Sequence, residues 1–304
     1  MGSPKLLLQS GIGPEEHLKS VGVPVKHKLS GVGQNLQDHL DLFVICECTG
    51  DHTYDNVGKL HRTLWAGLQY VLFKSGPVAS SLFETGGFWY ADENARSADI
   101  QFHFGLGSGI EAGVAAMKNG GATLNSAYMR PRSRGSVRLA SSNPNDAPLI
   151  DPNYWSDPYD KEMSLRGLRM AREIMYQSSL KPFLNREHLP GAELSTDEEL
   201  FNYACANAKT DHHPVGTCRM GVDEAAVSDP DAANVCFDGV EPDNMDGYRN
   251  RTGFPPIGSD RNSRVTPPLA CTFRPPHCEQ HNASRDCSTV IVTPPFAYSV
   301  ERYS

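Results

Sequence analysis

The sequence predicts a mixed α/β (α+β) fold, in which strands and helices alternate over roughly the first 230 residues. Residues 41–48 and 99–104 have the alternating or continuous apolar pattern of strands. Residues 60–73 predict a helix that carries one apolar stripe, made of Leu64, Leu68 and Val71. Two further segments carry helix-initiation signals, described below.

Size, charge and composition limit the classes of partner. The chain has 304 residues, of which 21% are charged and 39% hydrophobic, enough for two ordinary domains or one large one. A net charge of −8 without a basic stripe disfavours a nucleic-acid partner. No apolar run approaches the roughly 18–20 residues that span a bilayer. We expect no secretory signal at Met1–Lys5. The oligomeric state and the compartment stay open.

The first forty residues predict short elements joined by turns. Residues 4–10 and 15–20 predict two helices, each followed closely by a glycine. Residues 23–25 predict a strand, and residues 30–39 a loop.

A β-rich segment follows in the middle of the chain. Residues 127–130 and 136–139 predict strands on either side of a turn at 131–135. Three prolines further on exclude regular structure there: Pro144, Pro148 and Pro152.

Two helices are predicted before residue 210. Asp157 is a suitable N-cap for the first, which has Pro158 in its first turn and runs to about residue 178. The second begins at a capping box over Ser195–Glu198 and ends at about Ala208.

The eight cysteines form no pair of CxxC motifs, so we expect no structural zinc site. Cys46 and Cys48 share one face of a predicted strand. We expect reduced, packed thiols rather than a disulfide framework.

The last 74 residues differ in composition from the rest. Residues 231–304 hold nine prolines, one leucine, seven arginines and no lysine. So few large aliphatic side chains cannot offset the ordering entropy of the segment. We expect an irregular tail, disordered or non-native, with the composition of a frame-shifted or intron-derived sequence.

The stretch TDHHPVGTCRMG at residues 210–221 contains the main candidate for catalysis. His213 precedes a proline, which holds its backbone extended. An imidazole with its ordinary pKa of about 6.5 can accept a proton, as alcohol oxidation requires. His212 and His213 could equally be ordinary surface residues. A metal site with Asp211 is disfavoured because adjacent side chains diverge.

Residues 213–221 resemble the H-P-x-G-T-x-x-M-G loop of the glucose–methanol–choline (GMC) oxidoreductases. Four other segments resemble segments of that family in the same order: 2–14, 31–39, 130–137 and 148–154. The resemblance implies a partial GMC-type flavin-binding domain, an antiparallel-sheet substrate domain with helices, and a tail outside the family pattern.

The resemblance also implies a division of the chain. Residues 1–40 would be part of the FAD-binding domain and residues 41–208 the substrate-binding domain. Residues 209–230 would form the active-site histidine loop on the flavin side, and residues 231–304 the irregular tail.

FAD is the cofactor that the resemblance implies, and a small-molecule alcohol is the substrate. His213 would be the proton acceptor or hydrogen-bond donor at the substrate hydroxyl, while hydride passes to flavin N5. The cofactor contacts would come from Gly33, Asn35, Asp38, His39, Pro214 and Val215. The same loop could instead be a tight turn in which Asp38 caps the backbone.

Residues 80–89 give a pointer to the substrate. Glu84 and Phe88 place an acid among aromatic rings, which suits a cationic head group, and the stretch resembles the F-E-x-G-G-F segment of choline-dehydrogenase-like members. The alternative is a strand and glycine turn with a solvated glutamate. We expect His103 to pack rather than to catalyse.

Two departures from the family pattern keep three hypotheses open. No G-x-G-x-x-G follows a strand, and the segment bearing the family's second active-site residue does not follow residues 227–230. The chain is an FAD-dependent oxidoreductase acting on CH–OH groups, a non-catalytic truncated fragment, or a flavin-containing hydroxynitrile lyase-like protein. We expect the polypeptide as written, incomplete at both ends, to bind FAD poorly.

Overall fold

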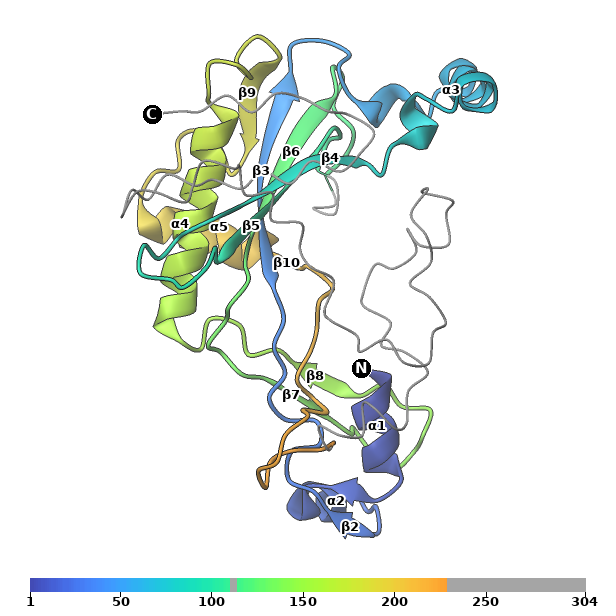
Figure 1. Cartoon of the computed structure of the whole chain (residues 1–304), viewed down its shortest axis with the longest axis vertical. Coiled ribbons are helices and arrows are strands. Elements are labelled where there is room, and N and C mark those ends of the chain that lie inside the picture. The colour runs from blue at the N-terminus through green and yellow to red at the C-terminus, as the bar shows by residue number, and fades with distance from the viewer. Residues whose placement is uncertain (110–113, 229–304) are drawn as a thin grey trace, which may run out of the picture.

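The computed structural model describes residues 1–109 and 114–228. A large sheet backed by helices forms one part, and a smaller unit containing the N-terminus lies beyond one end of that sheet (Figure 1). The prediction of a mixed helix-and-strand protein is confirmed.

The large sheet has six strands, and all of its pairings are antiparallel. Its strands are β3 (Leu40–Cys48), β4 (Phe83–Trp89), β5 (Ile100–Gly105), β6 (Gly121–Tyr128), β9 (Leu184–Leu189) and β10 (Lys209–Thr210). The order is β10-β3-β6-β5-β4, and β9 also pairs with β3. β10 and β9 occupy opposite ends of the same edge of β3, so β10 delivers the chain to the end where β3 begins.

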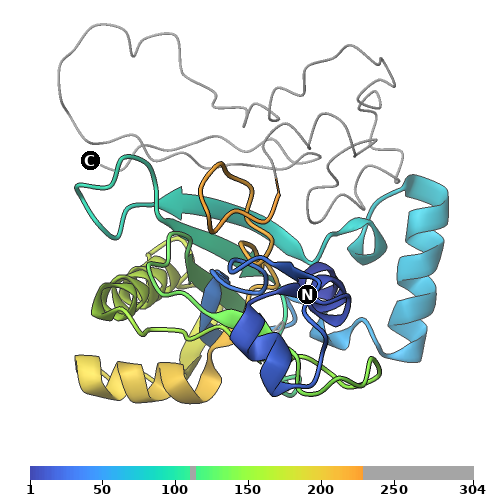
Figure 2. The same ribbon diagram turned by 90° about the horizontal axis from the view of Figure 1, so that it is seen from below.

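Two helices cover one face of the sheet, α4 (Pro158–Met175) and α5 (Asp197–Asn207) (Figure 2). The main core lies between them and β3 and β6, where large apolar side chains such as Leu42, Leu168 and Met175 are almost fully buried. The opposite face of the sheet carries neither helix (Figure 2).

A buried ion pair connects α4 to β9. Glu187 on β9 accepts a hydrogen bond from Arg172 of α4 at 2.8 Å and another from the backbone N–H of Gly191 at 3.1 Å. Arg172 also donates to the carbonyl of Leu194 at 2.7 Å. The side chain of Glu187 has no exposed surface, so these bonds to Oε1 replace part of its lost hydration, while Oε2 has no hydrogen-bond partner among the described residues.

The small unit gathers short elements from two distant parts of the sequence. They are α1 (Gly2–Gln9), β1 (Ile12–Gly13), α2 (Glu15–Ser20), β2 (His27–Lys28), β7 (Ser136–Arg138) and β8 (Leu149–Asp151). Leu8, Leu18 and Val32 form its own fully buried core. His17 of α2 accepts a hydrogen bond from the N–H of Leu139, which ties the two parts together.

Several local predictions need correction. The strand predicted at residues 23–25 is wrong: β2 lies two residues later and pairs in parallel with β1. Regular structure does occur among the three prolines, because β8 fits between Pro148 and Pro152 and pairs with β7. The capping box lies one residue later than predicted, with Thr196 and Glu199 bonded reciprocally. The predicted N-cap Asp157 is confirmed and accepts from the N–H of Tyr159.

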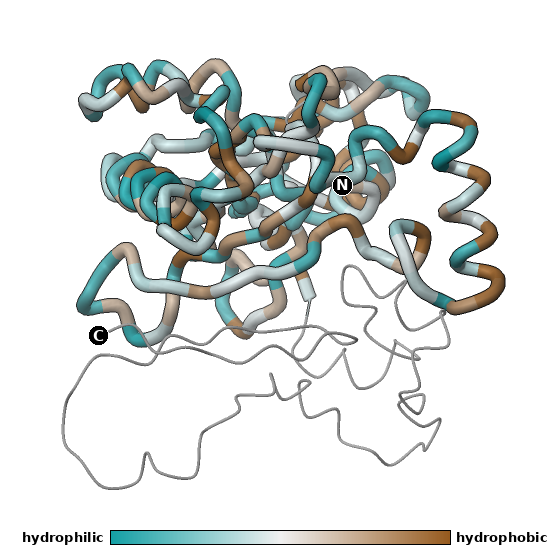
Figure 3. Tube along the Cα trace, turned by 90° about the horizontal axis from the view of Figure 1, so that it is seen from above, coloured by the Kyte–Doolittle hydropathy of each residue, from teal (hydrophilic) through white to brown (hydrophobic). Residues whose placement is uncertain are grey.

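The helix α3 (Leu60–Phe73) has the predicted bounds but does not bury the predicted stripe. Leu64, Leu68 and Val71 are 65%, 48% and 67% exposed, and only Ala66 is buried. α3 stands at the periphery of the molecule, with apolar residues around much of its surface (Figure 3). It is followed by the 3₁₀ turn η2 (Pro77–Ala79) and preceded by η1 (Tyr54–Asn56).

The cysteines at 46, 48, 205 and 218 are free, in agreement with the expected reduced thiols. The irregular tail predicted for residues 231–304 lies outside the described residues. Among the helices of residues 1–109 and 114–228, none is long and apolar enough to cross a membrane.

Candidate active site around His213

Three segments that are far apart in the sequence meet at the end of the sheet where β3 begins. Gln37 and Val215 exchange backbone hydrogen bonds of 2.9 and 2.8 Å, which join the 31–39 loop to the histidine loop. Leu36 and Gly135 exchange another pair, of 3.0 and 2.9 Å. The loop at 31–39 is therefore held between two other segments that resemble the GMC pattern.

Close backbone packing at this junction requires glycine at two positions. Gly33 has a φ of +76°, and a Cβ there would lie 2.2 Å from the carbonyl oxygen of Val137. Gly216 has a φ of +95°, and a Cβ there would lie 2.2 Å from the carbonyl oxygen of Asn35. Side chains at these positions would both strain the backbone and force the loops apart.

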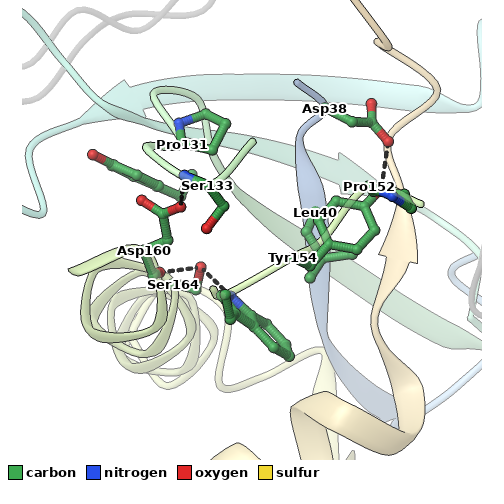
Figure 4. A pocket seen from close by; sticks show the side chains of 10 residues that line it. Asp38, Leu40, Pro131, Ser133, Pro152, Tyr154, Asp160 and Ser164 are labelled. Carbon is green, nitrogen blue, oxygen red and sulfur yellow. Dashed lines mark hydrogen bonds between the residues drawn. The ribbon is translucent and has the colours of Figure 1, made fainter. Parts of the chain in front are cut away.

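Asp38 anchors the histidine loop. Its buried carboxylate accepts from the hydroxyls of Tyr154 and Thr210, each at 2.5 Å, and from the backbone N–H of His213 at 3.0 Å. Figure 4 shows the Tyr154 phenol directed at this carboxylate. Burial and the hydrogen bond to Asp38 raise the pKa of Tyr154, which keeps it a neutral donor. Asp38 thus fixes the backbone of His213.

His213 is partly exposed and lies against a buried carboxylate. Oδ2 of Asp211 lies 3.0 Å from Nδ1 of His213 and 3.8 Å from Nδ1 of His39. The rings of His39 and His213 meet edge to face, with centroids 5.4 Å apart. Burial raises the pKa of Asp211, whereas His39, His213 and His103 lower it, and the pKa ends below its ordinary value.

A second layer of polar side chains lies deeper in the sheet. The polar atoms of Asp41 on β3, His103 on β5 and Asp211 are all within 4.8 Å of one another. Asn125 on β6 donates to Asp41 at 2.9 Å. His103 was expected only to pack, and the structure places it beside the carboxylate that contacts His213.

The remaining predicted cofactor contacts occupy two kinds of position. Pro214 and Val215 are exposed beside His213, and Val215 is 59% exposed. Asn35 is partly buried, has a left-handed backbone, and donates from Nδ2 to the carbonyl of Gly216 at 3.3 Å. Gly33, by contrast, is buried and donates its N–H to Thr217 at 2.9 Å. All of these residues lie at the same junction.

Glu84 and Phe88 both lie on β4, the strand at the far edge of the sheet from β10. Glu84 accepts from the hydroxyl of Tyr54, and from that of Ser80 at 2.5 Å. Phe83, the residue before Glu84, has its ring 5.6 Å from that of His103. β4 is therefore linked to the carboxylate cluster through His103.

Two cavities adjoin Asp38. One has a volume of about 20 Å³, room for about one water molecule, and lies between Asp38, Tyr154 and Asp160 (Figure 4). The other, of about 580 Å³, is open and mostly apolar, with His212 and Pro214 among its lining residues. The first cavity is too small for a substrate.

Asp211, Tyr154 and Thr210 are site residues that the sequence predictions missed. Asp211 was considered only as a metal ligand together with His212 and His213, and that possibility was disfavoured; the structure places its carboxylate beside His39 and His213. One polar atom from each of His39, Asp211 and His213 lies within 4.8 Å of the other two. The only signal in the sequence was an acidic residue two positions before a histidine, which is too common to assign a role.

Comparison with known proteins identifies the family. Residues 131–240 match the C-terminal family model described as GMC oxidoreductase. The chain is 38% identical over 242 residues to an oxygen-dependent choline dehydrogenase of Brucella ovis, an alignment that covers 79% of this chain and 44% of that protein. It is 38% identical to human mitochondrial choline dehydrogenase, with coverages of 76% and 39%. For the alcohol dehydrogenase [acceptor] of Pseudomonas putida, the identity is 36% and the coverages are 76% and 42%.

The chain belongs to the GMC oxidoreductase family, and it spans less than half the length of these relatives. Solved structures show the same fold. Pyridoxine 4-oxidase from Mesorbium loti matches with a TM-score of 0.63 and 29% identity, over 76% of this chain and 42% of that one. A formate oxidase matches with a TM-score of 0.65 and 26% identity, over 72% and 43%. The resemblance and the fold class predicted from the sequence are confirmed.

Proposed function

We propose that this chain carries the substrate side of an FAD-dependent oxidoreductase that acts on the CH–OH group of an alcohol, with His213 as the proton acceptor. The observation that carries the proposal is the convergence of three family-like segments on one imidazole. His213 is held by Asp38 through its backbone and by Pro214 through its conformation, so the ring has a defined position.

The exposed residues beside His213 suit a planar ring system. Pro214 and Val215 present an apolar surface next to the imidazole, and Asn35 lies across the loop from them. These residues would lie against the flavin ring. Bound FAD would supply the hydride acceptor. Gly33 and Asp38 would act indirectly, by holding the loops together.

The residues of this chain would manage the proton and the orientation of the alcohol. His213 accepts the hydroxyl proton as the carbinol carbon gives up its hydride. Asp38 keeps the imidazole from moving while the proton is transferred, because its carboxylate bonds the His213 N–H, the Thr210 hydroxyl of the same loop and the Tyr154 hydroxyl of another segment. Misplacement of a base by about 1 Å can cost ~10²-fold in rate.

Glu84 supports a cationic alcohol as the substrate. Two hydroxyl groups donate to its carboxylate. Among the residues that the structure describes, no lysine, arginine or histidine forms an ion pair with Glu84. Its negative charge would therefore attract a quaternary ammonium group, with Phe88 as a candidate aromatic contact. Choline, on which several relatives act by name, is the substrate to test first.

The test uses the purified protein with FAD, mixed anaerobically with choline. We expect choline to bleach the flavin absorbance, and His213→Ala to slow this reduction by ~10²–10⁴-fold, as for the loss of a general base. His212→Asn is the matched control, because the neighbouring histidine has a left-handed φ of 59° that asparagine tolerates. Reduction at the same rate in His213→Ala would remove His213 from this role.

Two other results would select the alternative functions. Cyanide release from a cyanohydrin, without flavin reduction by any alcohol, would indicate a lyase. A protein that never retains flavin would be non-catalytic. For the substrate class, Glu84→Gln should weaken the use of choline and not that of an uncharged alcohol of similar size.

A further inference from the structure

Asp211 lies two residues before His213 in the sequence, and its carboxylate lies beside the His213 ring. Its side chain is only 6% exposed, and Oδ2 lies 3.0 Å from Nδ1 of His213. His212, between them, has a left-handed backbone. This conformation turns the chain, so that Asp211 and His213 face one another while His212 points outward. Asp211 itself is held by its N–H, which donates to the carbonyl of His39 at 3.0 Å.

Besides His213, three groups face Asp211, and they come from two other parts of the fold. His39 lies at the start of β3, Asp41 on β3, and His103 on β5. Asp41 is engaged by the amide of Asn125 at 2.9 Å. An ionised carboxylate is costly to bury unless positive or hydrogen-bonding groups surround it. The three imidazoles near Asp211 favour its charged form. Its buried Oδ2 atom has no hydrogen bond within the usual angle and distance limits among the described residues, which leaves this atom available to Nδ1 of His213 at 3.0 Å.

We propose that Asp211 is a positioning residue for His213: its carboxylate accepts the N–H of Nδ1 and thereby makes Nε2 the basic nitrogen of the ring. The catalytic consequence rests on the function proposed above. In the proton transfer, the substrate O–H bond breaks and an Nε2–H bond forms, while the Nδ1–H bond remains. The positive charge that appears on the imidazole lies next to the negative charge of Asp211.

The arrangement explains why this carboxylate is buried. Serine proteases use a buried aspartate in the same relation to a histidine, to select the tautomer and to stabilise the imidazolium that forms. Here Asp38 fixes the backbone of His213, and Asp211 fixes the protonation state of its ring. The two carboxylates therefore have separate tasks.

The tautomer can be measured without any cofactor. The chain is labelled with [¹⁵N]histidine, and the ring nitrogens of His213 are assigned by loss of its signals in His213→Gln. At alkaline pH, where a free neutral imidazole carries its proton mainly on Nε2, we expect wild-type His213 to carry it on Nδ1. In Asp211→Asn the signal should move toward the Nε2–H form, because the amide NH₂ group can donate to Nδ1.

The matched control is Asp223→Asn, which removes an exposed carboxylate paired with Arg219. It should leave the His213 signals unchanged. A wild-type His213 protonated on Nε2 would overturn the proposal, and so would an unchanged Nδ1–H signal in both Asp211→Asn and Asp211→Ala. The wild-type measurement decides the question even where a variant fails to fold.

A kinetic measurement then tests the catalytic consequence. In the FAD-containing protein, Asp211→Asn should lower the rate of flavin reduction by ~10²–10⁴-fold, the upper figure being the loss for the equivalent change in a serine protease. KM should change little, because the Asp211 side chain is only 6% exposed and lies beside His213, where it would not contact the alcohol. An Nδ1–H tautomer in a protein without alcohol oxidation would sustain the positioning role and refute the proposed function.

Discussion

The strongest structural prediction concerns Asp38, because one buried carboxylate connects three segments of the site. Asp38→Asn preserves shape but removes the charge and one of two acceptor oxygens. The native carboxylate has three donors, the hydroxyls of Tyr154 and Thr210 and the N–H of His213. An amide oxygen cannot serve all of them, and the amide nitrogen would be directed at another donor.

The expected loss follows from these contacts. A hydrogen bond to a charged group contributes about 1.5–3 kcal/mol, and a buried donor without a partner costs about 1–3 kcal/mol. We expect Asp38→Asn to lower the free energy of unfolding by about 2–4 kcal/mol. Tyr154→Phe removes only one donor and should cost about 1–2 kcal/mol. Since the two residues are in contact, the double variant should lose less than the sum of the single losses.

Urea denaturation followed by far-UV circular dichroism measures all four proteins in this cycle. The midpoint should move while the slope stays constant, which would show that stability changed and not the unfolding mechanism. Asp223→Asn serves as the control, because an exposed ion pair is worth about 0–1 kcal/mol. An Asp38→Asn loss no larger than that of the control, or full additivity with Tyr154→Phe, would refute the anchoring role.

Two further predictions follow from the pKa directions. The pKa of Asp211 is lower in the folded protein than its ordinary value, so its carboxylate contributes stability that is present above about pH 4 and is lost as the pH falls through the folded-state pKa. The melting temperature of Asp211→Asn should therefore depend less on pH in acid than that of the wild type. Parallel curves for the two proteins would contradict this. Burial, with the charge of Glu187 as a smaller cause, raises the pKa of Cys46 to about 12, and burial also raises the pKa of Cys48 to about 11. Peptide mapping by mass spectrometry should find both thiols unlabelled by iodoacetamide at neutral pH and labelled in guanidinium. Rapid labelling of the folded protein would show instead that the thiols are accessible.

Local signals predicted the elements that have local causes. Asp157 and Pro158 define the start of α4 because an N-cap side chain bonds a backbone N–H two residues away. The bounds of α3 follow from its helical period. β9 was missed because its sequence, LNREHL, has no strand pattern. It is a strand only because it pairs with the exposed edge of β3.

The candidate site also has some features that were predictable from local sequence and others that depend on the tertiary fold. The motif around His213 was sufficient to predict that this histidine is the catalytic candidate. The contacts of the ring were not predictable, because His39 is about 170 residues away in the sequence and His103 reaches Asp211 only through the pairing of β5 in the sheet. Tyr154 likewise contacts Asp38 from a segment beyond the sheet.

The amino-acid sequence alone was sufficient for the family and the fold class, and it selected His213 as the catalytic candidate, because helix caps, hydrophobic periods and short motifs are properties of neighbouring residues. Only the tertiary structure decided that Asp211 lies beneath that histidine, that Asp38 anchors its loop and that α3 leaves its apolar stripe exposed. Each of these depends on how distant segments pack, and packing is the result of the whole fold rather than of any single stretch of chain.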